Sequence, residues 1–250
     1  METDAPHRET PANLAREFII AIATLSRWSL LARGEFGDAE ARARAMVFLP
    51  IIGLVAGVGF AFLDRSIGSS CALIAMIEVA AGAMDVIGIA DLVAAIRIGS
   101  RPASTGIARI GPLGAFAAIV WFIATSYLLG RIGEPADRSA ALVMAIMLSR
   151  WALVPIAYGL RPLERWGLGV PYEGPIRFRE FSISSAGAIF LTMTLYENVG
   201  LAIIVALALT ILAMRLVLSR RLGGAAGYAL AGGMALCELV VIATMAALTR

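Results

Sequence analysis

The sequence contains no lysine, one histidine and two cysteines, and charged residues make up only 16% of its 250 positions. All 21 basic residues are therefore arginines. His7 lies in a polar N-terminal stretch, which argues against histidine catalysis and against a histidine-rich metal site. Cys71 and Cys237 lie in apolar stretches, where cysteine acts as a small buried hydrophobic residue. A disulfide-rich secreted module is excluded.

Apolar residues are abundant instead. They make up 60% of the chain, and the mean hydropathy is +0.84, whereas soluble domains contain about 45–50% apolar residues. A water-soluble globule of this size cannot bury so much apolar surface. The composition therefore indicates an integral membrane protein and excludes intrinsic disorder.

Continuous apolar runs of helix length predict an all-α, polytopic membrane helical bundle of about seven spans. Residues 1–16 are predicted to be a flexible tail, and residues 17–250 a single membrane domain. Residues 17–32, interrupted by Arg27, form either a short interfacial helix or a further span. The predicted spans are 45–63, 71–96, 111–130, 139–160, 183–196, 198–218 and 228–248, with a tight helical hairpin around Glu197.

Arginines are richer in alternate loops, which sets the expected orientation. The segments 33–44, 97–109, 161–180 and 215–227 should lie on the cytoplasmic side of a bacterial-type inner membrane. The glycine and arginine clusters fall in these same segments, so a single site can form on one side of the membrane.

Three acids, Glu78, Asp85 and Asp91, lie in the 71–96 segment. A charged side chain near the bilayer centre costs about 2.5–3.5 kcal/mol on insertion scales, so these acids should face protein, water or a cation. Gly82 and Gly88 permit a break in the helix, which favours a broken helix lining a polar cavity. The alternative is that the acids pair with intramembrane arginines such as Arg27 or Arg150.

Glycines follow arginines in two of the arginine-rich loops. Such loops at helix starts can bind phosphate oxygens, because backbone N–H groups and the helix dipole both favour an anion. They are equally consistent with ordinary orienting charge and helix capping. The absence of lysine fits either nucleotide composition or arginines selected for phosphate binding. The candidate phosphate ligands are Arg101, Arg109, Gly111, Arg220, Gly223 and Gly224.

Several short motifs occur in a fixed order over about residues 18–245, and together they resemble the cobalamin synthase family, the adenosylcobinamide-GDP ribazoletransferases. The motifs are Leu25-Ser26-Arg27, the run from Phe48 through Pro50 and Gly53 to Gly57, Ser149-Arg150, the run from Pro155 to Tyr158, Gly167-Leu168-Gly169, the run from Arg220 to Gly227, and Glu238. The resemblance implies a transferase of cobalamin biosynthesis that joins adenosylcobinamide-GDP and α-ribazole, or its 5′-phosphate, and releases GMP. It also implies a Mg²⁺ cofactor, with Asp91 and Asp85 as the metal ligands in this chain.

The chain departs from the family at its acids. Ile87, Ala94, Ile107 and Tyr228 stand where the family has aspartates, and Asp85 stands at a histidine position. Enzymatic activity is therefore left open. The alternatives are a noncatalytic relative that binds a corrinoid or nucleotide-linked molecule or a partner subunit, and a small membrane transporter. Besides the lipid bilayer, a homo- or hetero-oligomeric partner stays open, and no nucleic-acid partner is expected.

The charge pattern makes a direct prediction of topology. Reporters that are active only in the cytoplasm should be active when fused within 97–109, 161–180 or 215–227, because those loops hold the arginines. A fusion at residue 197 should read as external. An internal signal from the 197 fusion would show that both the hairpin and the charge count had been misread.

Overall fold

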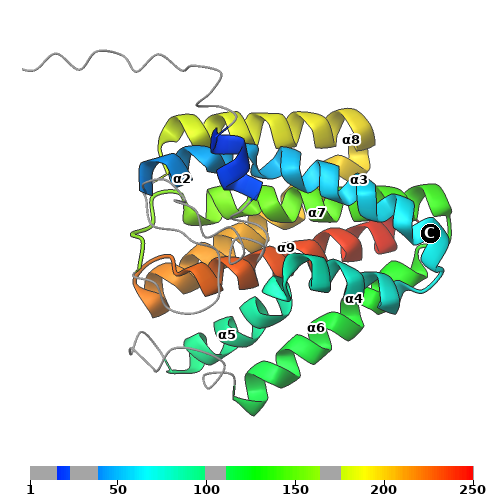
Figure 1. Cartoon of the computed structure of the whole chain (residues 1–250), viewed down its shortest axis with the longest axis horizontal. Coiled ribbons are helices and arrows are strands. Elements are labelled where there is room, and N and C mark those ends of the chain that lie inside the picture. The colour runs from blue at the N-terminus through cyan, green and yellow to red at the C-terminus, as the bar shows by residue number, and fades with distance from the viewer. Residues whose placement is uncertain (1–15, 23–38, 99–110, 164–175, 250) are drawn as a thin grey trace, which may run out of the picture.

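The computed structural model describes residues 16–22, 39–98, 111–163 and 176–249. Nearly all of these residues are helical and none forms a strand, which confirms the all-α prediction. A short helix over residues 16–22 precedes the others (Figure 1). The remaining elements are α2 (Ala39–Ala45), η2 (Met46–Phe48), α3 (Leu49–Ile67), α4 (Ser70–Ala81), α5 (Met84–Ile98), α6 (Pro112–Arg131), α7 (Pro135–Ala157), α8 (Phe178–Val217), η4 (Leu218–Leu222) and α9 (Gly227–Leu248).

Five described helices are long and apolar enough to cross a membrane, and the bent pair α4–α5 raises this number to six if it counts as one span. The predicted number of seven is therefore not confirmed. Whether residues 17–32 span the membrane stays open, because only residues 16–22 of that region are described. Arg27, Arg101 and Arg109 also lie outside the described residues.

Helices α7 and α9 form the centre of the bundle. The apolar window of α7 is 89% buried and that of α9 is 72% buried, whereas those of α3, α6 and α8 are between 28% and 33% buried. The outer helices therefore present apolar side chains to the surroundings, as a lipid-facing surface requires. Trp121 on α6 donates from Nε1 to the Ala235 carbonyl oxygen at 2.8 Å, which fixes α6 against α9.

Glycines allow α3 to lie close to α7. A Cβ atom on Gly53 would approach the Ile146 carbonyl oxygen at 2.8 Å, and one on Gly57 would approach the Val143 Cα at 2.8 Å. Real Cβ atoms do not come this close to backbone. Two glycines four residues apart indicate close helix packing in membrane proteins, and Gly53 and Gly57 serve that role here.

The chain reverses direction within α8 at Glu197, where φ is 37° and ψ is −111°. Phe181, near the start of α8, stacks on Tyr158 with ring centroids 4.6 Å apart. Arg215, near its end, donates from Nη1 to the Tyr158 carbonyl oxygen at 2.5 Å. Both ends of α8 thus lie at the same residue, so α8 consists of two antiparallel arms, as the predicted hairpin requires.

The predicted break in the 71–96 segment lies at Gly82 and Ala83. Both residues have positive φ, 71° and 57°, and α4 meets α5 at a bend of 82°. The carboxylate of Glu78 accepts a hydrogen bond from the backbone N–H of Val86 at 3.3 Å. An acid at the end of α4 thus satisfies a donor in the first turn of α5, where the helix itself offers no acceptor.

The arginine-bearing segments gather at one end of the bundle (Figure 1). This end, called the arginine-rich face below, comprises residues 39–44, 97, 161–163, 176–180 and 215–227. Arg177 pairs with Glu40 across it at 2.5 Å, and Pro162 pairs with Ala225 in an isolated parallel bridge. The C-terminal end of α9 and the turn between the two arms of α8 lie at the opposite end (Figure 1).

Candidate functional site

Arg150 lies on the central helix α7 and is only 6% exposed. Its Nη1 donates to Glu238 Oε2 on α9 at 2.8 Å and to the neighbouring Ser149 Oγ at 2.7 Å. Its Nη2 donates to Asp85 Oδ2 on α5 at 3.4 Å. One guanidinium therefore joins three helices, and the sequence alternative in which acids pair with Arg150 is confirmed for Asp85. Glu238 is its closer partner, which the sequence alone did not indicate.

Glu78 lies at the edge of this group, on the other side of the helix break. Its Oε1 and the Oδ1 of Asp85 have no hydrogen-bond partner among the described residues. Asp85 is fully buried, and Glu78 is 5% exposed. Three carboxyl groups thus surround a single guanidinium, which cannot balance the charge of all three. We call Glu78, Asp85, Arg150 and Glu238 the buried ionic cluster.

Asp91 points away from the buried ionic cluster. It lies six residues beyond Asp85 on the same helix, a rotation of about 600°, so its side chain leaves the helix axis about 120° away from that of Asp85. It is 8% exposed. Asp91 is the acid that keeps its place in the family motif, and it lies closer than Asp85 to the arginine-rich face, where α5 ends.

The described side chains do not fit a magnesium site built from several carboxylates. They contain no group of three His, Cys, Asp or Glu residues placed to hold a metal ion. An oxygen of Asp85, one of the two predicted ligands, already accepts from Arg150. The assignment of Asp91 and Asp85 to Mg²⁺ stays a prediction, and no reaction step is derived from it.

Apolar packing occupies the described positions where the family has further acids. Gly88 on α5 and Gly232 on α9 are in close contact, since a Cβ on Gly88 would meet the Gly232 nitrogen at 2.5 Å. Ala94 is 8% exposed and Tyr228 is 5% exposed in this same pair of helices. The contact between α5 and α9 is thus maintained without the acids.

The glycines after Arg220 build the loop between η4 and α9. Gly223 ends η4 with φ of 76°. Gly224 lies under the Arg161 carbonyl oxygen, where no Cβ would fit, and that oxygen accepts from the Ala225 N–H at 2.9 Å. Both glycines thus have a backbone role, while Arg220 is exposed on the surface of the arginine-rich face. Their assignment to phosphate stays a prediction.

Three helices begin at the arginine-rich face. The residues before their first turns are Gly111 for α6, Arg177 for α8 and Ala226 for α9, and no described side chain caps these N-termini. Trp121 lies nine residues after the first residue of α6, and Ala235 lies eight residues after the first residue of α9. Because these two residues are hydrogen-bonded, α6 and α9 begin at a similar level in the bundle. Uncapped N–H groups and helix dipoles therefore add positive potential to that of the arginines.

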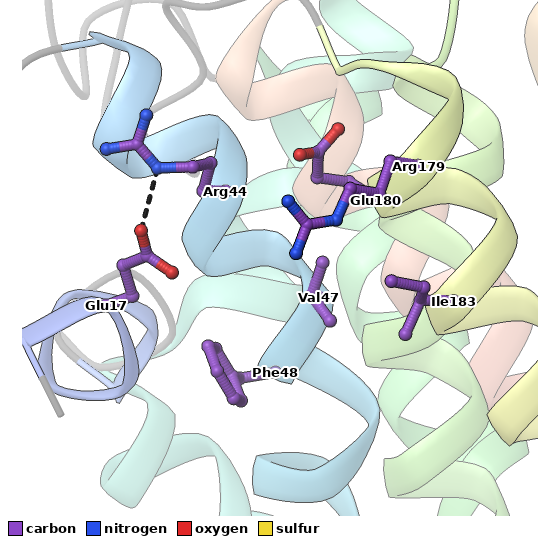
Figure 2. Close-up of a pocket in the computed structure, with 7 residues that line it drawn as sticks. All are labelled: Glu17, Arg44, Val47, Phe48, Arg179, Glu180 and Ile183. Atoms are coloured by element: carbon purple, nitrogen blue, oxygen red, sulfur yellow. Dashed lines mark hydrogen bonds and ion pairs between the residues drawn. The ribbon is translucent and has the colours of Figure 1, made fainter. Parts of the chain in front are cut away.

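The same face contains a small pocket that sequence reasoning missed. Its volume is about 60 Å³, and Arg44 and Arg179 line it together with Glu17 and Glu180 (Figure 2). Arg44 Nε donates to Glu17 Oε1 at 2.7 Å. The sequence did contain one indication of this pocket. Glu180 and Ser184 are polar residues four positions apart at the start of an apolar run, so they lie on one side of the predicted helix, next to Arg179.

Replacement of Arg150 by methionine should lower the free energy of unfolding by about 3–5 kcal/mol, because it leaves Asp85 and Glu238 buried without their cation. Adding Asp85→Asn and Glu238→Gln should recover much of this loss. Arg138→Met is the matched control, since it breaks the more exposed Arg138–Asp64 pair at the opposite end. Unfolding followed in one detergent measures all three variants, and wild-type stability in Arg150→Met would show that the cluster contributes nothing.

The family model of cobalamin-5-phosphate synthase matches residues 17–246. The adenosylcobinamide-GDP ribazoletransferase of Syntrophobacter fumaroxidans (strain DSM 10017 / MPOB) is 28% identical over 217 residues, which cover 82% of this chain and 87% of that protein. No solved structure matches. The chain therefore belongs to the cobalamin-5-phosphate synthase family.

Proposed function

We propose that the chain binds the phosphate-bearing substrates of the adenosylcobinamide-GDP ribazoletransferase reaction at its arginine-rich face. One observation supports this above the others: the N-termini of α6, α8 and α9 lie at the same end of the bundle as the exposed Arg220 and Arg221. Dipoles and guanidinium groups together favour a pyrophosphate. The face would lie in the cytoplasm, at a bacterial-type inner membrane, where soluble nucleotide-linked substrates can reach it.

In that reaction, α-ribazole or its 5′-phosphate attacks the pyrophosphate of adenosylcobinamide-GDP, and GMP leaves as an anion. Mg²⁺ supplies neutralisation of the phosphate oxygens in the family. In this chain, the arginines and the uncapped helix starts would hold the phosphates and favour the leaving anion. Asp91 is the carboxylate left at a matching motif position for the metal.

A second function, that of a noncatalytic binding relative, is favoured by one specific observation. Asp85 is bound to Arg150 inside the bundle, and four motif acids are replaced. A single acid can bind a hard cation through water, yet it orients the pyrophosphate poorly, and a misplacement of about 1 Å can cost on the order of a hundredfold in rate. We therefore expect transferase activity to be absent or much weaker than in a relative with all the acids.

Complementation of a synthase-deficient bacterial strain tests catalysis. The chain should give no growth, or strongly delayed growth, without added cobalamin, while an intact relative at the same membrane abundance restores growth. Robust growth would overturn the expectation of weak catalysis. In that case Asp85→Asn and Asp91→Asn should each abolish growth. Normal growth with both substitutions would refute the assignment of these residues to the metal.

Binding is tested separately, because a noncatalytic relative should still bind. Arg220→Ala should weaken binding of adenosylcobinamide-GDP to the purified protein by roughly tenfold to a hundredfold, since a charge-assisted contact contributes about 1.5–3 kcal/mol. Arg131→Ala, an exposed arginine at the opposite end, is the matched control and should bind like the wild type. Equal affinities of all three proteins would remove the arginine-rich face as the substrate site.

A further inference from the structure

A groove runs along the side of the bundle between the start of α3 and the first arm of α8. Its volume is about 370 Å³, within the range of roughly 300–1,000 Å³ typical of small-molecule sites. Ile51 and Ile183 on its rims are 51% and 50% exposed, so the groove opens sideways, toward the membrane. The lining residues are Val47, Phe48, Pro50, Ile51, Met147, Ile183, Ser184, Gly187, Ala188 and Leu191.

The groove continues into the small charged pocket of the arginine-rich face. The two share Val47, Phe48 and Ile183. Figure 2 shows the side chains of Arg179 and Glu180 reaching from α8 toward the helix that bears Arg44 and Val47. The combined site is therefore amphiphilic, with charges of both signs at the membrane surface and an apolar channel below them.

One stripe of α8 follows the whole length of this site. Glu180, Ser184, Ala188 and Leu191 recur at spacings of three and four residues, so they lie on one side of the helix. Gly187 lies beside them, and a Cβ there would meet no described atom within 4 Å. The stripe changes from carboxylate to hydroxyl to aliphatic with increasing depth, which matches the order of groups along a phospholipid.

Two polar atoms on this stripe have no bonding partner. Glu180 is 4% exposed and Ser184 is 2% exposed, yet Glu180 Oε2 and Ser184 Oγ have no hydrogen-bond partner among the described residues. A buried polar atom without a hydrogen-bond partner destabilises the fold. A ligand that donates to Glu180 and accepts from Ser184 would remove both deficits.

We propose that this groove binds one membrane glycerophospholipid whose headgroup contains an amino group. The ammonium donates to Glu180, the phosphate lies beside Arg44 and Arg179, and an ester carbonyl oxygen accepts from the Ser184 hydroxyl. The acyl chain follows Gly187 and Leu191. A headgroup with phosphate alone would leave the Glu180 carboxylate unpaired next to another anion, and a free phosphate would leave the apolar channel empty. The lipid headgroup contacts Arg44, Arg179 and Glu180, whereas the substrate contact tested above is Arg220, so the two proposals stand or fall separately.

Native mass spectrometry of the purified full chain in mild detergent tests the lipid site. The probes are phosphatidylethanolamine and phosphatidylglycerol with identical palmitoyl-oleoyl chains. The wild-type protein should retain one phosphatidylethanolamine per chain, with an affinity about tenfold above that for phosphatidylglycerol. Equal retention of the two lipids would overturn the proposal.

Two variants probe the two ends of the groove. Gly187→Leu fills the apolar channel and should weaken phosphatidylethanolamine binding about tenfold. Gly59→Leu is its matched control, a helical glycine with equally open space on α3 outside the groove, and it should bind like the wild type. Unchanged binding in Gly187→Leu would refute the site.

Glu180→Gln keeps the side-chain size and should remove the preference for phosphatidylethanolamine while leaving phosphatidylglycerol binding within about twofold of the wild type. The unfolding temperature of each variant, measured without added lipid, checks the fold. Should Gly187→Leu fail to fold, Glu180→Gln decides, because a preference that survives this change overturns the proposed headgroup contact.

Discussion

The contact of Arg150 with Glu238 and Asp85 is the constraint on which the bundle depends. α7 is almost entirely enclosed by its neighbours, and Arg150 is buried in its second half, whereas Arg138 in its first turn is more exposed. A buried cation is tolerated only when it is paired and hydrogen-bonded. α5 and α9 must therefore present their acids at the same depth, and this requirement sets how both helices sit against the centre. The break before α5 helps to meet this requirement, because it places Asp85 in the first turn of α5, within reach of Arg150 on α7.

Local patterns in the sequence predicted the features that depend on near neighbours. Gly82 predicted the break because a left-handed residue is needed there, and Gly53 and Gly57 predicted a close helix contact because one turn separates them. The pairing of Arg150 with Glu238 spans 88 residues, and no periodicity in a single sequence relates two positions so far apart. The charged pocket was missed for the same reason, because its walls come from α8 and from the segment around Val47.

Residues 17–246 show membership of the family, whereas the family's reaction stays a proposal for this chain. The backbone features shared with the family have structural roles of their own: Gly53 and Gly57 serve packing, and Gly223 and Gly224 shape a loop. In the resemblance drawn from the sequence, Ala94 and Tyr228 stand at two aspartate positions, and both are buried within a well-packed helix pair. A sequence can therefore keep the fold while the carboxylates change, which is why fold alone does not establish activity.

The turns that connect the helices are short at the end opposite the arginine-rich face. There, α3 is joined to α4 by Gly68 and Ser69 alone, α6 is joined to α7 by residues 132–134, and the two arms of α8 meet at Glu197. Turns this short leave little polypeptide beyond the membrane surface for another molecule to hold. The helix ends that border residues 99–110 and 164–175 lie at the arginine-rich face. Among the described residues, a soluble compound therefore finds little backbone outside the helices at the opposite end and more polar contacts at the arginine-rich face.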